Sequence, residues 1–365
     1  MRIGILGSGQ LGRMLALAAH PLGHRVVVLG PGAGDPAMAV AEPIVAALDD
    51  ASALDSLAAR VDVVTFEFEN VPAEALSRLE GRLPVRPSRL ALETGADRLL
   101  EKTLFRELGI ATAPFAAVDD QPSLESALGV IGLPAILKTR RLGYDGKGQR
   151  RLRSPADVDG AFASLGGVPA IVEGVVAFER ELSMVGARGL DGAIALWAPV
   201  ENVHDAGILH VSRSPARVMA PSTRAAAEAA NTAILERLAY VGVLAVELFV
   251  VGERVLANEI APRVHNSGHL TIEGAETSQF ENHVRAICGQ PLGSTRACGS
   301  SAMLNLVGAL PDVERVLAIP GAHVHLYGKS ERAGRKIGHV TIRAADDRER
   351  ELRLGDVIAL DRWTA

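Results

Sequence analysis

Hydrophobic positions in the first hundred residues alternate between two spacings. Short apolar runs at 2–6, 25–29 and 61–66 have the length and composition of buried strands, whereas 10–20 and 54–60 have helical spacing. Strands that alternate with helices form a parallel sheet covered by helices on both faces. This part of the chain is therefore predicted to be a Rossmann-like α/β domain.

Beyond it the pattern changes twice. A charged helical segment at 97–108 leads into a compact α+β unit, in which the apolar strand 135–139 precedes a glycine-rich loop. The remainder is rich in strands, with a clear pair at 244–251 and 254–260 that favours a mostly antiparallel sheet. The predicted domains are 1–100, 101–176 and 177–365.

Composition narrows the class of protein. With 48% hydrophobic residues, 22% charged residues and a net charge of −5, the chain is globular, and neither nucleic acid nor a membrane surface is expected as its partner. No apolar run approaches membrane-spanning length. The two cysteines, Cys288 and Cys298, fit no metal-binding spacing and indicate a reducing compartment, so a cytoplasmic protein is expected.

Lysine is rare in this chain and is concentrated in two basic, glycine-bearing stretches. Only five of the 38 basic residues are lysine, and four of the five lie in 136–148 or 327–336. Because arginine supplies charge elsewhere, a retained lysine suggests a site that needs a compact ammonium, as phosphate sites often do. Two such stretches predict two phosphate-bearing ligands. The fifth lysine, Lys102, fits a solvated surface charge equally well.

A glycine-rich turn, Gly7-x-Gly9-x-x-Gly12, follows the first predicted strand and opens the first helix. This is the context of a dinucleotide-binding fingerprint. The fingerprint also requires an acidic residue at the end of the second strand to hold the ribose, but Leu29-Gly30-Pro31 stands there. An NAD-dependent oxidoreductase is therefore disfavoured, and the turn is expected to offer its backbone N–H groups to another ligand.

Two glutamates on the later strand pair form a candidate metal site. If the turn 252–254 takes three residues, Glu247 lies opposite Glu259, with Cβ atoms about 5 Å apart. Facing carboxylates repel unless a cation lies between them, and such a site suits Mg²⁺ shared with nucleotide phosphates, with Mn²⁺ as an alternative. Two solvated glutamates at a sheet edge would fit the apolar flanking residues poorly.

The loop that follows, 262–269, crowds polar groups beside this candidate site. Such a loop is costly to desolvate and usually faces a polar substrate. Structural capping by Asn266 and Ser267 would account for neither Arg263 nor His265.

These motifs together resemble the ATP-grasp superfamily, and most closely its N5-carboxyaminoimidazole ribonucleotide synthetases. The most specific parts of the resemblance, which covers nearly the whole chain, are Arg263-Val-His-Asn-Ser-Gly-His269 and Gly334-Arg-Lys-Ile-Gly-His339. It implies an ATP-grasp fold with an N-terminal Rossmann-like parallel-sheet domain, a small central lid domain and a C-terminal mostly antiparallel-sheet domain. In the lid, Leu142 departs from the glycine that is usual before Gly143-Tyr-Asp-Gly146.

The resemblance also implies an activity. The expected enzyme is an ATP-dependent carbon–nitrogen ligase of purine biosynthesis, which carboxylates 5-aminoimidazole ribonucleotide with bicarbonate and releases ADP and phosphate. Mg²⁺ and a homodimer are implied with it. Another ATP-grasp ligase, such as a formate-dependent glycinamide ribonucleotide transformylase, stays open as an alternative, as does a non-catalytic nucleotide-binding regulator. The loop 263–266 and the tail 334–336 favour the carboxylating enzyme.

Roles for individual positions follow from the same resemblance. ATP is assigned to Arg98, Lys138, Gly143, Tyr144, Asp145, Gly146, Lys147, Gly148, Gln149, Glu173, Gly174, Val175, Val176, Glu181, His204, Asn258 and Glu259. Substrate binding is assigned to Gln10, Glu67, Glu69, Tyr144, Asp145, Lys329 and Arg335, with the last two at the 5′-phosphate. Catalysis is assigned to Lys138, Arg263, His265 and Asn266, and the metal to Glu247 and Glu259.

Overall fold

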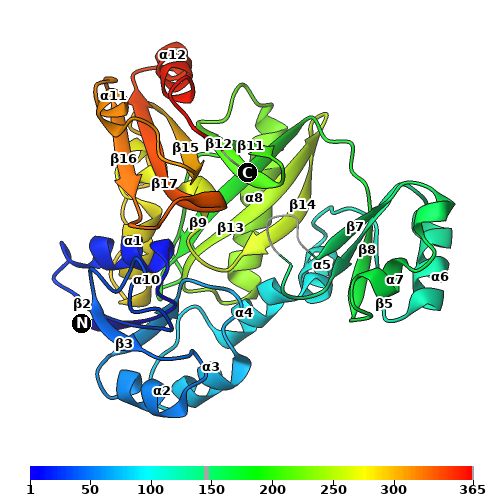
Figure 1. Cartoon of the computed structure of the whole chain (residues 1–365), viewed down its shortest axis with the longest axis horizontal. Helices are drawn as coiled ribbons and strands as arrows, with labels where there is room; N and C mark the ends of the chain where they lie inside the picture. The colour runs from blue at the N-terminus through cyan, green and yellow to red at the C-terminus, as the bar shows by residue number, and fades with distance from the viewer. Residues whose placement is uncertain (144–147, 364–365) are drawn as a thin grey trace.

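The computed structural model describes residues 1–143 and 148–363, and their strands form three separate sheets (Figure 1). One sheet lies near the N-terminus, one in the small unit at the side of the molecule, and the largest in the C-terminal half. Mixed α/β content with an N-terminal parallel sheet and a large antiparallel sheet confirms the predicted fold class.

The N-terminal sheet is parallel, with the order β3-β2-β1-β4, and helices cover both faces. On one face, residues of α1 such as Leu15 pack with Ile3 of β1, and on the other Leu54 of α2 and Leu76 of α3 pack against the sheet. Strand β3 was not predicted from the sequence, because it is mostly exposed and so lacks an apolar run. The elements are β1 (Arg2–Leu6), α1 (Gln10–Ala19), β2 (Arg25–Gly30), β3 (Glu42–Val45), α2 (Ala51–Ala58), β4 (Val63–Phe66) and α3 (Ala73–Glu80).

Two consecutive helices, α4 (Arg89–Ala96) and α5 (Arg98–Glu107), lead from this sheet to the small unit. The carboxylate of Asp97 accepts hydrogen bonds from the N–H groups of Leu99 and Leu100, which caps α5 and allows a sharp change of direction between the helices. The small unit is an antiparallel sheet of order β5-β8-β6-β7, and α6 and α7 contribute to its core. Its elements are β5 (Phe115–Val118), α6 (Gln121–Ile131), β6 (Ala135–Thr139), β7 (Gln149–Leu152), α7 (Ala161–Ser164) and β8 (Ala170–Gly174).

The large sheet is antiparallel and runs β14-β13-β9-β11-β12-β15-β17-β16, with β10 paired to β9. Its strands are β9 (Arg180–Arg188), β10 (Ile194–Leu196), β11 (Val200–Asp205), β12 (Ile208–Ser214), β13 (Gly242–Val251), β14 (Arg254–Ala261), β15 (Ser300–Gly308), β16 (Ala322–Leu326) and β17 (Arg332–Ala344). The helices of this half are α8 (Pro221–Arg237), α9 (Thr271–Gly274), α10 (Gln279–Ile287), α11 (Val313–Leu317) and α12 (Asp347–Ile358).

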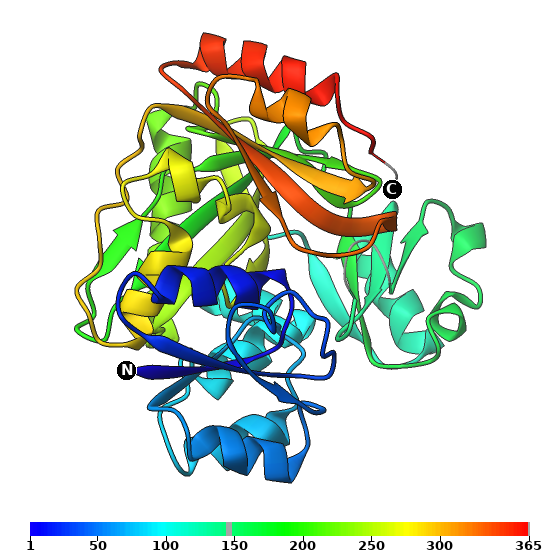
Figure 2. The ribbon, with the colours of Figure 1, turned by 60° about the vertical axis from the view of Figure 1, so that its left-hand side comes forward.

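The N-terminal and large sheets share one hydrophobic core. Figure 2 shows α1 lying between the N-terminal sheet and the C-terminal half, where it packs against α10. The imidazole of His283 in α10, fully buried, contacts Thr65 Oγ1 of β4 at 2.8 Å and accepts a hydrogen bond from the N–H of Val243 in β13 at 3.1 Å. No helix in the described part of the chain is long and apolar enough to cross a bilayer.

Candidate active site

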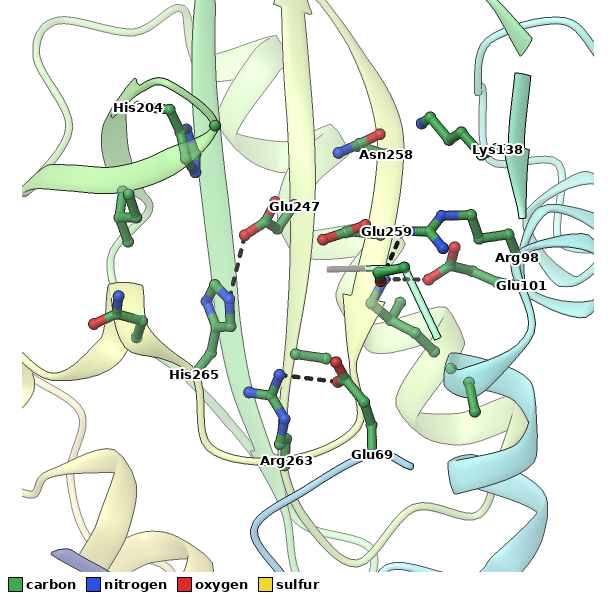
Figure 3. A pocket seen from close by; sticks show the side chains of 18 of the residues that line it. Glu69, Arg98, Glu101, Lys138, His204, Glu247, Asn258, Glu259, Arg263 and His265 are labelled. Carbon is green, nitrogen blue, oxygen red and sulfur yellow. Dashed lines mark hydrogen bonds and ion pairs between the residues drawn. The ribbon is translucent and has the colours of Figure 1, made fainter. Parts of the chain in front are cut away.

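A cavity of about 680 Å³ lies where the three sheets meet, and Figure 3 shows the side chains that line it. Strands β13 and β14 form its floor, α5 and β6 contribute basic groups, and the loop after β4 contributes glutamates. Most of the residues assigned from the sequence line this cavity: Gln10, Glu67, Glu69, Arg98, Lys138, Gly143, Gln149, Glu181, His204, Glu247, Asn258, Glu259, Arg263, His265 and Asn266.

Glu247 and Glu259 are register partners on β13 and β14, as the sequence predicted. The assumed three-residue turn was wrong, because Val251 pairs directly with Arg254 and leaves a two-residue connection. A register shift further along the two strands from the turn restores the pairing of Glu247 with Glu259. There, Asn258 is an extra residue in β14 between Ala257 and Glu259. Such a β-bulge bends the strand and re-aims side chains. Figure 3 shows both carboxylates directed into the same part of the cavity.

The two carboxylates have the chemistry of a cation site. Burial, together with the nearby charge of Glu259, raises the pKa of Glu247 to about 8. A divalent cation would replace the proton that Glu247 holds at this raised pKa and remove the repulsion between the two carboxylates. Among the described residues no group of three or more His, Cys, Asp and Glu side chains could hold a metal ion. A metal here would therefore rely on two carboxylates and on oxygens from a bound ligand.

The loop after β14 is held in place by Gln279 at the start of α10. Its side chain accepts a hydrogen bond from the N–H of His265 at 2.9 Å and donates one to the carbonyl of His265 at 2.6 Å. The His265 ring lies with Nδ1 2.8 Å from Ser267 Oγ and Nε2 3.3 Å from Glu247 Oε1. Burial, with the nearby charge of Arg263 adding to it, holds the pKa of His265 well below its usual range. The ring is therefore neutral near pH 7.

Two further members of this loop face the cavity. Arg263 forms an ion pair of 2.9 Å with Glu69, so the guanidinium is oriented by the loop that follows β4. The side-chain amide of Asn266 is buried, and neither its nitrogen nor its oxygen has a hydrogen-bond partner among the described residues. A buried amide without partners is costly, so this position favours a polar ligand.

The basic side of the cavity is built by α5 and β6. Arg98 donates to the carbonyls of Thr139 at 3.2 Å and Gly143 at 3.1 Å, which ties the helix to the start of the glycine-rich loop. Lys138 of β6 lies on the same side of the cavity as Arg98 (Figure 3). On the far wall His204 Nδ1 is 2.6 Å from Glu181 Oε2. Residues 144–147, which include the assigned Tyr144, Asp145, Gly146 and Lys147, lie outside the described residues.

Several assigned residues do not line the cavity. Glu173 is 4% exposed and lies beneath Lys138, with Oε1 3.2 Å from its ammonium, and the assigned Gly174, Val175 and Val176 follow it at the end of β8. Gly148 also lies outside the lining. Lys329 Nζ is 2.5 Å from Gln10 Oε1, and Arg335 donates to Ser330 Oγ at 2.7 Å. Lys329 therefore reaches the cavity through Gln10, whereas Lys336 of the same stretch lines the cavity directly.

The glycine turn of the N-terminal sheet is filled by the protein itself. The carboxylate of Glu67 accepts hydrogen bonds from the N–H of Gly9 and, at 2.6 Å, from the N–H of Gly12. A Cβ atom on Gly7 would lie 2.5 Å from Glu67 Cγ. The N–H groups of Gly9 and Gly12 are thus occupied by the protein's own carboxylate, so the expectation that this turn offers them to another ligand was wrong.

Sequence reasoning missed several residues that line the cavity, namely Glu101, Phe178 and Phe249. His269 and Lys336 also line it, as members of the polar loop and of the second basic stretch, although neither had been given a role of its own. Glu101 follows Arg98 by three positions, so the two share one face of a helix, and that spacing was a usable signal. The rings of Phe178 and Phe249 stack with centroids 4.5 Å apart, but they come from segments distant in sequence. No local pattern reports such a pair.

Comparisons with known proteins indicate the same family for each part of the chain. Family models match residues 1–95 (ribonucleotide synthetase preATP-grasp domain), 103–280 (ATP-grasp domain) and 301–353 (phosphoribosylaminoimidazole carboxylase C-terminal domain). The N5-carboxyaminoimidazole ribonucleotide synthase of Pseudomonas aeruginosa is 52% identical over 360 residues, which cover 99% of each chain. The chain belongs to the N5-carboxyaminoimidazole ribonucleotide synthase family. The resemblance drawn from the motifs is thereby confirmed.

Solved structures of this family have the same fold. The N5-carboxyaminoimidazole ribonucleotide synthetase of Thermus thermophilus superimposes with a TM-score of 0.95 at 50% identity, covering 99% of this chain and 98% of that one. A family member from Aspergillus clavatus, whose structure contains ADP and 5-aminoimidazole ribonucleotide, has a TM-score of 0.91 at 31% identity and covers 98% of both chains. The ATP-grasp fold predicted from the sequence is confirmed.

Proposed function

We propose that this protein carboxylates 5-aminoimidazole ribonucleotide to N5-carboxyaminoimidazole ribonucleotide in purine biosynthesis, using ATP and bicarbonate. The observation that carries the proposal is one cavity that joins three parts. These are a basic side at Arg98 and Lys138, the facing carboxylates Glu247 and Glu259, and a polar loop with the unpartnered amide of Asn266. A transformylase that uses formate is not favoured, because the relatives of high identity are named as synthases.

In this proposal ATP lies between the lid and the large sheet. Arg98, Lys138, and the loop 143–149 receive its phosphates, while Glu181 and His204 lie on the opposite wall. Glu247 and Glu259 would hold Mg²⁺, which supplies charge neutralisation at the phosphates, and Mn²⁺ offers the same oxygen chemistry. The backbone after Glu173, through Val176, continues from the lid sheet towards the large sheet and would contact the base.

The ribonucleotide lies on the other side of the carboxylate pair. Gln10 comes from α1, and Glu67 and Glu69 come from the loop after β4. Lys329 and Arg335 supply positive charge for the 5′-phosphate. Tyr144 and Asp145 belong to this group by resemblance alone. The reacting carbon would then lie near Arg263, His265 and Asn266, between the two phosphate-bearing ligands.

The reaction begins when an oxygen of bicarbonate attacks the γ-phosphorus of ATP and ADP leaves. Lys138 and Arg98 stabilise the negative charge that spreads over the transferred phosphoryl group. The amine of the ribonucleotide then attacks the carboxyl carbon of carboxyphosphate, or CO₂ released from it, and phosphate and a proton leave. The neutral ring of His265 can orient these groups by hydrogen bonding but carries no charge near pH 7.

Water must be excluded during these steps, since carboxyphosphate hydrolyses. The unit formed by residues 101–176 carries the glycine-rich loop, whose described ends Gly143 and Gln149 line the cavity. We assign to this unit the role of a lid, with 1–100 and 177–365 as the other two domains. The family resemblance also leads us to propose a homodimer that acts in the cytoplasm.

A coupled assay of phosphate release tests the proposal. Release from ATP should require 5-aminoimidazole ribonucleotide, bicarbonate and Mg²⁺ together, and the carboxylated product should form in equal amount. Turnover that depends on formate instead of bicarbonate would contradict it, as would ATP hydrolysis that the ribonucleotide does not affect.

A further inference from the structure

Helix α5 carries a lysine that faces inward at the junction of the lid and the large sheet. Lys102 is 1% exposed, and Figure 1 shows α5 at this junction, beside the lid sheet. A solvated surface charge was one interpretation of this residue from the sequence, and the burial excludes it. A buried ammonium is retained only where it is paired and hydrogen-bonded.

The contacts of Lys102 join separate parts of the chain. Its Nζ is 3.4 Å from Glu173 Oε2 in the lid strand β8. It donates to Thr112 Oγ1 at 3.1 Å and to the carbonyl of Ala257 at 3.4 Å, and Ala257 is the residue before the bulge in β14. One side chain therefore contacts strand β8 of the lid sheet, the segment between α5 and β5, and the strand of the large sheet that carries the metal-site glutamate.

The charges around Glu173 are unequal. Lys102 and Lys138 both pair with this one carboxylate, Lys138 at 3.2 Å and Lys102 at 3.4 Å. Two ammonium groups pair with one carboxylate, which leaves one positive charge in excess. The neighbouring Glu101 does not cancel it, because burial, together with the charge of Glu259, raises the pKa of that carboxyl well above its usual range. Lys138 lines the cavity, whereas Lys102 does not. The excess charge is therefore available at the position of Lys138, where a phosphate can reach it.

We propose that Lys102 is a positioning residue for the nucleotide: it neutralises Glu173 from behind, so that Lys138 is oriented by this carboxylate but keeps its charge for the ligand. Without Lys102, Lys138 and Glu173 would form a closed pair, and phosphate binding would have to break it. The proposal rests on the assignment of Lys138 to the ATP phosphates.

The same helix also fixes the strand that carries the metal site. On either side of the bulge, the free edge of β14 is bound by groups outside the sheet. Before it, Lys102 and Thr112 Oγ1 donate to the carbonyl of Ala257, and after it Glu101 Oε1 accepts the N–H of Ile260 at 2.5 Å. Lys102 thus contributes to the positions of Asn258 and Glu259 as well as that of Lys138.

The first experiment compares Lys102→Met with Arg106→Met, measured by calorimetric titration with ATP and Mg²⁺ in the absence of the ribonucleotide. Methionine keeps the length of the side chain and removes its charge. Lys102→Met should weaken ATP binding about tenfold, as expected for the loss of one charge-assisted contact. Arg106 lies one turn further along α5 and is exposed, so Arg106→Met should leave the affinity unchanged. Unchanged affinity in Lys102→Met would overturn the proposal.

The second experiment separates the charge effect from a loss of structure. In Lys102→Met/Glu173→Gln the carboxylate is also removed, so Lys138 is no longer held in a closed pair, and ATP affinity should recover most of what the single substitution lost. A purely structural role for Lys102 would make the double variant at least as weak as the single one, and that result would refute the inference. Lys138→Met tests the underlying assignment separately, because normal ATP affinity in this variant would instead contradict the proposed function.

Discussion

Glu259 is the residue on which the proposed cation site depends most directly. Glu259→Gln keeps the size of the side chain but leaves Glu247 as the only carboxylate at the site. We expect kcat/KM to fall about a hundredfold, because the lost charge-assisted contact contributes about 3 kcal/mol. The measurement is turnover across a Mg²⁺ titration, with Glu253→Gln at the exposed hairpin turn as the control. Normal turnover of Glu259→Gln at ordinary Mg²⁺ would remove the metal assignment.

Lys329 tests which phosphate belongs to which basic stretch. It contacts Gln10 and lies outside the cavity lining that contains Lys138. Lys329→Ala should raise the KM for the ribonucleotide about tenfold to a hundredfold and leave that for ATP nearly constant. Arg332→Ala, an exposed position in the same stretch, is the control. A selective rise in the KM for ATP would mean that the two stretches have been assigned to the wrong ligands.

Leu142 has a backbone conformation that suits the glycine usual in the family. Its φ is 64°, in the left-handed region, and its side chain is 73% exposed. Leu142→Gly should raise the free energy of unfolding of the lid by about 0.5–1 kcal/mol, because relief of strain exceeds the added entropy of the unfolded chain. Hydrogen exchange in β6 and β7 measures this. Leu142→Ala keeps the strain and should show no gain, so equal stabilisation by both variants would contradict the explanation.

At the scale of elements, β6, β13 and β14 could be predicted from their apolar runs, whereas β15, which is buried along its whole length, and the polar strand β11 could not. Strand β6 was located to the residue, because its apolar run is short and lies between Pro134 and the polar residues that begin at Lys138. Strand β11 was missed because four of its six residues, among them Glu201, Asn202 and His204, are polar. These residues break the alternation of apolar and polar positions that is expected of a strand. The pairing of β13 with β14 was correct although the turn was not, since the bulge compensated for the shorter turn.

The glycine turn at the start of α1 allows a test at this scale. Gly9 has ordinary extended backbone angles, but a Cβ atom there would lie 2.7 Å from Glu67 Oε1. Gly9→Ala should displace the carboxylate from both N–H donors and lower the free energy of unfolding by about 1–3 kcal/mol. It should also raise the KM for the ribonucleotide more than that for ATP. Gly34→Ala, where no atom lies within 4 Å, is the control for urea unfolding and kinetics. Equal behaviour of the two variants would show that Glu67 is not held by the turn.

At the scale of the whole molecule, the sequence predicted part of each sheet but not how the sheets meet. Facing carboxylates on one hairpin follow from local spacing. The burial of Glu173 between two lysines depends on where α5 lies between the lid and β14, and no spacing within the chain reports that distance. The same holds for His283, which contacts strands of two different sheets and was not singled out in the sequence.

His283 makes stability depend on pH. Its burial lowers the pKa to about 3, and Nδ1 accepts from Val243 while Nε2 lies against Thr65, so the ring is neutral in the folded protein. The unfolded chain binds a proton near pH 6.5, so between the two values it holds more protons than the folded one. Stability from this residue is therefore fully present above about pH 6.5 and falls by about 1.4 kcal/mol for each pH unit below it.

In His283→Gln the new side chain can accept and donate hydrogen bonds in the same places. Between pH 6 and 5 this variant should reduce the slope of the unfolding free energy against pH by the equivalent of about one bound proton. Urea unfolding at several pH values measures the slope, and His323→Gln, at an exposed position in β16, is the matched control. His269 is also buried with a pKa of about 3, so a slope of the same sign should persist in the variant. If His283→Gln and His323→Gln retain the full wild-type slope, His283 does not couple the two sheets to pH.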